Sequence, residues 1–295
     1  MPADFIDDLR LAHVLADTAD NHSMEKFGAV DLQVSTKPDM TWVTEADQAV
    51  EEALRRTLRS ARPRDVVLGE EAGEEPGSGS GQRRWIIDPI DGTSNFVRGV
   101  PVWASLIALE VDGEVVAGCV SAPAIGRRWW AAQGSGAFTG KSLLSSRPIS
   151  VSQVSRLEDA SLSYASLGGW EEIGKAQAFA ALMRRCWRTR AYGDFWSYML
   201  LAEGAVDIAA EPELKVWDMA ALDIVVREAG GRFTSLAGEP GPWGENAVAS
   251  NGLLHDEAMA YVGHFPDDPG VVHDGWDDEP DDSSGTVHRL HFGPE

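Results

Sequence analysis

Hydrophobic residues recur every three or four positions in the first sixty residues, which places them on one face of a helix. The first such set consists of Phe5, Leu9, Ala12, Ala16 and Ala19. The second set, within residues 44–60, consists of Val50, Ala53, Leu54 and Leu58. The pattern therefore predicts two amphipathic helices, the second beginning at Thr44.

The hydrophobic period then changes to two, which is typical of strands. Short runs rich in apolar residues predict strands at 85–88, 105–111, 114–120 and 127–132. The dipeptide Asp112-Gly113 between the second and third of these indicates a hairpin turn. The first run ends at a proline, and the Gly-, Ser- and Glu-rich segment 73–81 is interpreted as a mobile loop.

Helical and strand-like segments alternate in the second half of the chain. Helices are predicted at 176–187, 194–203 and 218–229, and strands at 188–192 and 205–210. This alternation favours α/β layering, with helices covering a mixed sheet. The polar segment 139–150 is the candidate boundary between halves. We therefore expect an N-terminal α+β half over 1–145, a C-terminal α/β half over 146–265 and an acidic, disordered tail over 266–295.

Composition and charge narrow the possible functions. Hydrophobic residues make up 43% of the 295, enough to build a sizeable core. A formal charge of −22 argues against a nucleic-acid-binding surface, although bound cations would still allow an anionic substrate. We expect no membrane association, because no apolar run approaches the roughly 20 residues of a membrane span. The N-terminus lacks the features of a secretion signal, so a cytoplasmic protein is expected.

The segment Asp88-Pro89-Ile90-Asp91-Gly92-Thr93 carries the strongest indication of chemistry. An apolar strand leads into Asp88, the proline interrupts the ladder, and Asp91 follows three residues later. Two carboxylates and an intervening carbonyl can then converge on hard cations, which prefer oxygen ligands. Gly92 permits close backbone approach, and amides near Thr93 would face an anion if a helix begins there.

Three other acidic positions have structural explanations when each is taken alone. Glu70-Glu71 follows an apolar run and is explained by an exposed acidic turn. Asp218 at the start of a predicted helix is explained as an N-cap, worth ~1 kcal/mol. Thr44 and Asp47 have the spacing of a capping box.

Together these segments resemble the inositol monophosphatase superfamily. Leu68-Gly69-Glu70-Glu71, Trp85 to Thr93 and Trp217-Asp218-Met219-Ala220-Ala221 are similar to its three signature motifs, in the same order. Lys37-Pro38-Asp39 and Thr44-Glu45-Ala46-Asp47 match its N-terminal segment. The resemblance covers residues 5–264 and implies a layered α/β/α/β/α sandwich, a homodimer and Mg²⁺-dependent hydrolysis of a small phosphate ester.

The resemblance also implies roles for individual residues. Ligands of the first Mg²⁺ would be Glu70, Asp88 and the Ile90 carbonyl. Those of the second would be Asp88, Asp91 and Asp218, and Glu70 would assist a weaker third ion. Thr93 and Asp47 would orient and deprotonate the attacking water at the first ion, and amides around Gly92 and Thr93 would hold the phosphate. Asp218 would also border the substrate.

A second resemblance concerns the substrate. Residues 100–105, 190–198, 202–207 and 209–212 are similar to the histidinol-phosphatase branch of the superfamily. Histidinol phosphate carries an ammonium and an imidazole, which Asp194 and Glu211 would attract. A helix N-cap after Gly193 also explains Asp194. The alternatives are an inositol-1-phosphate phosphatase and a binding partner of the transcription machinery, and the full set of predicted metal ligands disfavours the second.

Overall fold

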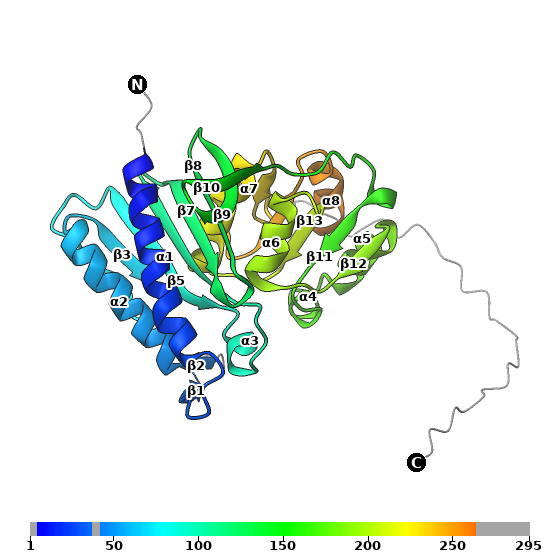
Figure 1. Cartoon of the computed structure of the whole chain (residues 1–295). Helices are drawn as coiled ribbons and strands as arrows, with labels where there is room; N and C mark the ends of the chain where they lie inside the picture. The colour runs from blue at the N-terminus through cyan, green and yellow to red at the C-terminus, as the bar shows by residue number, and fades with distance from the viewer. Residues whose placement is uncertain (1–4, 37–41, 264–295) are drawn as a thin grey trace, which may run out of the picture. The chain divides into compact units, whose positions relative to one another are not determined.

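The computed structural model describes residues 5–36 and 42–263, which form five layers (Figure 1). Helices α1 (Ile6–Lys26) and α2 (Glu45–Ala61) cover one face of an eight-stranded sheet. Helices α6 (Asp194–Ala202) and α7 (Val216–Glu228) lie between this sheet and a five-stranded one. Helices α4 (Gly168–Glu172), α5 (Ala176–Arg185) and α8 (His255–Val262) cover the far side of the second sheet. The predicted α/β/α/β/α layering is confirmed.

The eight-stranded sheet has the order β10-β9-β8-β7-β6-β5-β3-β4. Its strands are β3 (Val66–Gly69), β4 (Gly73–Glu75), β5 (Arg83–Asp91), β6 (Ala104–Val111), β7 (Glu114–Ala122), β8 (Arg127–Ala132), β9 (Gly136–Ser142) and β10 (Ser145–Ile149). Strands β3 and β5 run parallel, whereas β6 and β7 form the predicted antiparallel hairpin. Asp112 and Gly113 in its turn have φ of 52° and 88°, as a type I′ turn requires.

The five-stranded sheet has the order β12-β11-β13-β15-β14. Its strands are β11 (Ser161–Ser163), β12 (Arg188–Arg190), β13 (Ile208–Glu211), β14 (Arg232–Thr234) and β15 (Ala247–Ser250). Strand β11 pairs in parallel with β12 and β13, while β15 pairs antiparallel with β13 and β14. The sheet is therefore mixed, as predicted. A separate ribbon joins β1 (Val34–Thr36) to β2 (Trp42–Thr44), next to helix α3 (Thr93–Val97).

Two segments differ in part from their sequence interpretation. The loop predicted at 73–81 begins with the strand β4 at 73–75, which pairs with β3 and is held by a hydrogen bond from Arg59 to Glu75, and only residues 76–81 form no helix or strand. The polar segment 139–150 forms parts of β9 and β10, which pair at the edge of the large sheet. Its polar character reflects edge-strand side chains that face solvent. The proposed boundary at 145 therefore falls at the start of β10, and the division into halves stays a prediction.

Element ends differ more modestly from expectation. Strand β5 does not end at Pro89 but continues to Asp91, with a register shift between Asp88 and Asp91. Helix α7 begins at Val216, so its N-cap is Lys215 and not Asp218. Residues 37–39 and the acidic tail lie outside the described residues. Within the described ranges, no helix combines the length and apolar character needed to cross a membrane.

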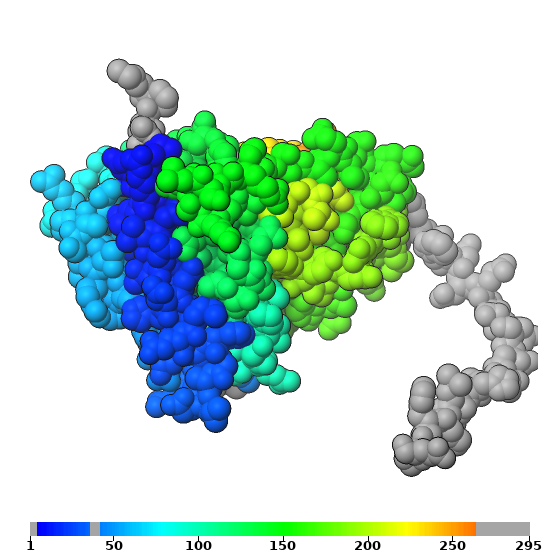
Figure 2. Space-filling model, in the orientation of Figure 1, coloured from blue at the N-terminus to red at the C-terminus, as the bar shows by residue number. Residues whose placement is uncertain are grey.

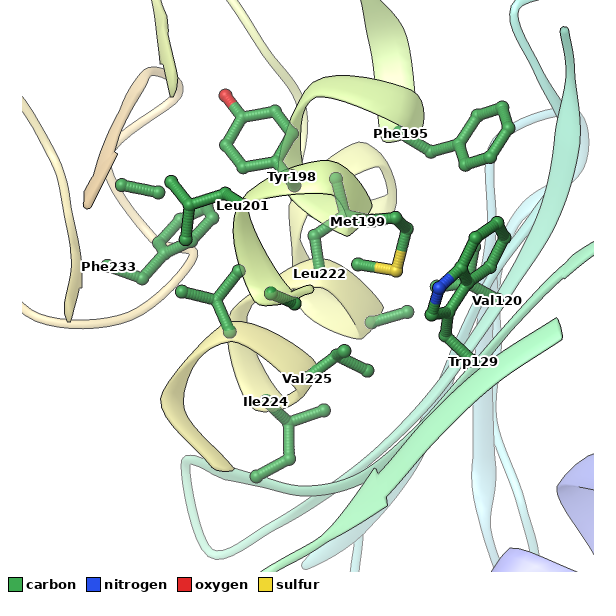
Figure 3. Close-up of a cluster of buried hydrophobic side chains, with 14 of the residues drawn as sticks. Val120, Trp129, Phe195, Tyr198, Met199, Leu201, Leu222, Ile224, Val225 and Phe233 are labelled. Carbon is green, nitrogen blue, oxygen red and sulfur yellow. The ribbon is translucent and has the colours of Figure 1, made fainter. Parts of the chain in front are cut away.

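The main core joins the two sheets through α6 and α7 (Figure 3). Val120 and Trp129 of the large sheet face Met199 of α6 and Val225 of α7. The approach of α7 to β7 is so close that a Cβ at Gly118 would lie 2.5 Å from the Ile224 Cγ2 atom. This contact fixes the position of α7 and hence of its N-terminus. A second core lies beneath α1, whose outer side forms part of the surface (Figure 2).

Candidate active site

A cleft of about 480 Å³ opens where β5, α3, α6, β13 and α7 approach one another. Nine of the ten predicted site residues line it: Glu70, Asp88, Ile90, Asp91, Gly92, Thr93, Asp194, Glu211 and Asp218. The tenth, Asp47, is fully buried and hydrogen-bonded to Thr93. Predicted residues separated by up to 148 positions in the sequence, from Glu70 to Asp218, thus line one cleft.

Three aspartates form the centre of the cleft. Asp88, Asp91 and Asp218 each place one carboxylate oxygen within 4.8 Å of the others. A backbone amide orients each carboxylate: Ile90 N donates to Asp88 (2.9 Å), Phe195 N to Asp91 (2.7 Å) and Lys215 N to Asp218 (2.7 Å). The irregularity at Pro89 lets two carboxylates from one strand point into the same cleft. This is the set predicted to hold the second ion.

The electrostatics of this cluster favour a bound cation. Burial raises the pKa of Asp218 to about 7, and burial with the nearby carboxylates raises the pKa values of Asp88 and Asp91 well above their ordinary range. Among the described residues that line the cleft, none is Lys or Arg. Buried carboxylates this close repel one another when ionised, and an all-oxygen set matches the ligand preference of hard divalent cations. The donor set therefore fits divalent metal ions.

Glu70 lies at the end of β3, where Glu70 N donates to the Ile87 carbonyl across the parallel pair (3.3 Å). Its charge is the largest contribution, after burial, to the raised pKa of Asp88. Glu70, Asp88 and Ile90, the set predicted for the first ion, all line the cleft. The exposed-turn explanation is therefore insufficient, since this turn faces the cleft.

Thr93 and Asp47 are joined directly. The Thr93 Oγ1 lies 3.2 Å from Asp47 Oδ1 and 3.0 Å from the Ile90 carbonyl oxygen. Asp47 also completes the predicted capping box of α2, since its Oδ2 accepts from Thr44 N (2.8 Å) and Thr44 Oγ1 (2.6 Å). Burial raises the pKa of Asp47. Asp47 Oδ2 thus caps helix α2, whereas Asp47 Oδ1 faces the Thr93 hydroxyl.

Asp194 is not an N-cap, because Gly193 occupies that position. Asp194 has φ of 48°, and its Oδ2 accepts from Asn95 Nδ2 (3.0 Å), which directs the carboxylate into the cleft. Burial raises the pKa of Asp194 to about 6. Glu211, at the end of β13, is also buried, and its Oε1 has no hydrogen-bond partner among the described residues. The capping explanation of Asp194 is wrong.

Sequence reasoning missed other residues of the cleft. Trp42, Tyr198 and Glu213 line it, and the Tyr198 hydroxyl is buried with no hydrogen-bond partner in the described ranges. Tyr198 lies four residues after Asp194, so the helical period alone places both on one face of α6. Asn95 was missed because its partner is 99 residues away.

A sequence model of the inositol monophosphatase family matches residues 9–264. The chain belongs to the inositol monophosphatase family. Members of this family depend on metal ions and cleave small phosphate esters, and the aspartate cluster agrees with both properties.

Two relatives resemble the chain over most of its length. A histidinol-phosphatase of Streptomyces coelicolor is 62% identical over 88% of this chain and 98% of its own. A histidinol-phosphatase of Mycobacterium tuberculosis is 61% identical over 86% and 96%.

Solved structures confirm the inositol monophosphatase fold. The extragenic suppressor protein suhB of Bartonella henselae has a TM-score of 0.79 and 32% identity, covering 87% of this chain and 98% of its own. An IMPase of Thermotoga maritima has a TM-score of 0.77 and 33% identity, covering 87% and 96%.

Proposed function

We propose that this chain hydrolyses L-histidinol phosphate to L-histidinol and phosphate, a step of histidine biosynthesis. The observation that carries the proposal is identity above 60% to two histidinol-phosphatases over nearly their whole lengths. The cleft supports it, because carboxylates suited to metal ions lie beside Asp194 and Glu211. A homodimer in the cytoplasm, using Mg²⁺, completes the proposal.

The metal ions would be held by five groups. Glu70, Asp88 and the Ile90 carbonyl would hold one, and Asp88, Asp91 and Asp218 another, with Glu70 assisting a third. When bound, divalent ions lower the pKa of water and neutralise charge on the phosphate and the leaving oxygen.

The protein's own groups orient the nucleophile and the phosphate. The single hydroxyl proton of Thr93 has Asp47 Oδ1 and the Ile90 carbonyl oxygen within reach as acceptors, and the lone pairs of its Oγ1 can accept a hydrogen bond from a water in the cleft. Asp47 is buried with a raised pKa, which makes its carboxylate a better proton acceptor through Thr93 than an exposed aspartate. The amides of Gly92 and Thr93 would bind phosphate oxygens. Gly92 allows this approach with φ of 85°, where a Cβ would lie 3.2 Å from the Val102 carbonyl.

The chemistry of the leaving group accounts for Asp194 and Glu211, the two predicted carboxylates of the cleft that are not assigned to a metal ion. Histidinol carries an ammonium group and a titratable imidazole, and both form charge-assisted hydrogen bonds with carboxylates. Asp194 and Glu211 offer such acceptors in the cleft, and Glu211 Oε1 has no partner among the described residues. The alternative substrate, inositol 1-phosphate, has only hydroxyl groups on its leaving group and would leave these carboxylates unneutralised.

Phosphate release from histidinol phosphate and inositol 1-phosphate, measured side by side, tests the proposal. We expect histidinol phosphate to be hydrolysed with the higher kcat/KM, EDTA to abolish activity and Mg²⁺ to restore it. A preference for inositol 1-phosphate would instead support the alternative substrate. No metal-dependent turnover on either ester would support a purely binding role, such as contact with the transcription machinery.

Asp194→Asn and Glu211→Gln should each lower kcat/KM for histidinol phosphate about ten- to a hundredfold, the size of a lost charge-assisted hydrogen bond of ~1.5–3 kcal/mol. Asparagine tolerates the positive φ at position 194, so the backbone is preserved. Steady-state kinetics on p-nitrophenyl phosphate should change little, because its leaving group carries no amine.

The control variant is Glu172→Gln, which removes an exposed carboxylate on α4. Equal losses on both substrates would assign Asp194 and Glu211 to the fold or the metals. Unchanged kinetics on both would contradict their contact with the leaving group.

A further inference from the structure

The turn that carries Glu70 is fastened to helix α2 by one buried side chain, Glu51. The two carboxylate oxygens of Glu51 accept from Glu71 N (2.8 Å) and Ala72 N (2.9 Å). On the other side of Glu70, a Cβ at Gly69 would lie 2.6 Å from the Glu51 carboxylate. Glu51 therefore accepts from the two backbone amides immediately after Glu70 and packs closely against the backbone at Gly69 immediately before it.

Arg55, one helical turn after Glu51, extends the same attachment. Its Nε donates to Glu51 Oε1 (2.8 Å), and its terminal nitrogens donate to the carbonyls of Val67 and Gly73. The side chains of Glu51 and Arg55 are only 2% and 3% exposed. All these backbone partners lie within residues 67–73, on either side of Glu70.

A buried ion pair contributes little to the free energy of unfolding, so stability alone does not explain why Glu51 and Arg55 are present. Taking two charges out of water offsets much of their attraction, and well-packed apolar residues often stabilise such a site as well or better. Here both charges point at the turn that places Glu70. The same helix carries Asp47 four residues before Glu51, on the same face, and the charge of Glu70 contributes to the raised pKa of Asp47. Helix α2 thus holds Asp47 directly and the Glu70 turn through Glu51.

We propose that Glu51, supported by Arg55, is a positioning residue that fixes Glu70 for metal binding. The inference rests on the proposed function, since it takes Glu70 as a metal ligand. Glu51 itself touches neither metal nor substrate; it sets where the Glu70 carboxylate lies relative to Asp88. Loss of a residue that orients a metal ligand from outside the coordination shell typically lowers metal affinity about 10- to 100-fold.

Glu51→Gln tests the proposal. Glutamine keeps the size of the side chain but replaces one acceptor oxygen with a donor, so it cannot accept from both turn amides. We expect the Mg²⁺ dissociation constant, measured by isothermal titration calorimetry, to rise about tenfold or more. Saturating Mg²⁺ should restore most of kcat, because the ligands themselves are intact. The matched control is Glu52→Gln, the next residue, whose half-exposed carboxylate pairs with the surface residues Arg56 and Arg59.

Glu51→Gln removes the nearer carboxylate partner of the buried Arg55 and leaves it only Glu75, at 3.4 Å, which can prevent folding. The double variant Glu51→Gln/Arg55→Gln removes both charges together and still lacks the carboxylate that holds the turn. The same weakened Mg²⁺ binding is expected of it. A folded variant, checked by circular dichroism, that binds Mg²⁺ with the wild-type dissociation constant overturns the proposal, even if its melting temperature has fallen.

The calorimetric measurement separates this inference from the proposed substrate. If the unaltered protein binds Mg²⁺ but does not hydrolyse histidinol phosphate, the proposed function fails, while weaker Mg²⁺ binding by Glu51→Gln still supports the positioning role. If the unaltered protein binds no Mg²⁺, both fail.

Discussion

Asp91→Asn should lower kcat/KM for histidinol phosphate by about three orders of magnitude or more, equivalent to roughly 4 kcal/mol of transition-state stabilisation. Asp91 belongs to the cluster with Asp88, which is buried, and Asp218, which like Asp91 is partly buried, and each carboxylate adds negative charge that attracts cations. Asparagine has the same shape, and its carbonyl oxygen can still accept from Phe195 N. The variant therefore removes charge and leaves the local hydrogen bond.

The measurement is steady-state kinetics at several Mg²⁺ concentrations, with circular dichroism to verify the fold. Asp112→Asn is the control, because asparagine tolerates the positive φ of that hairpin turn, far from the cleft lining. Turnover of Asp91→Asn close to that of the unaltered chain would refute the metal assignment.

Thr93→Ala should lower kcat about 10²- to 10⁴-fold, the usual contribution of a positioned proton-transfer group, with little change in KM. The hydroxyl connects the cleft to Asp47 Oδ1, and alanine breaks that connection without adding bulk. Asp47 itself is a less clean target, because its second oxygen caps α2 through Thr44.

Thr93→Ser supplies the comparison for this variant, since it restores a hydroxyl and should recover most of kcat. The parameters to compare are kcat and KM for histidinol phosphate at saturating Mg²⁺. A rise in KM with unchanged kcat would identify Thr93 as a residue that binds the phosphate in the ground state and has no part in proton transfer.

The features that could be predicted from the sequence are those specified by residues adjacent in the chain. In the segment Asp88-Pro89-Ile90-Asp91, the end of a strand, the irregularity at the proline and the predicted metal ligands are all adjacent in the sequence. Its geometry could therefore be predicted from neighbouring residues. Asp112-Gly113 likewise determines a hairpin on its own. The polar edge strands β9 and β10 were misread because solvent-facing side chains resemble those of a linker.

Features that depend on distant contacts could not be predicted. Asp194 is predicted to bind the substrate, with a helix N-cap as the other explanation, but nothing near it in the sequence indicates that Asn95 donates to its carboxylate. In the sequence, Glu51 cannot be told apart from the other acidic residues of its amphipathic helix, because the backbone amides that it binds lie 20 and 21 residues away. The burial of Glu51 becomes visible only when the layers are assembled.

The assembly of the cleft from distant elements has a consequence for folding kinetics. Asp88 and Asp91 come from the large sheet, whereas Asp218 begins a helix that reaches its place only by packing on β7 against Gly118. No short segment of the chain presents the three carboxylates together. The site of the second ion therefore forms only after α7 has packed on the large sheet, so this ion cannot nucleate folding. Interactions absent from the transition state slow unfolding and leave the folding rate unchanged. Mg²⁺ bound at this site should accordingly act by extending the lifetime of the folded state.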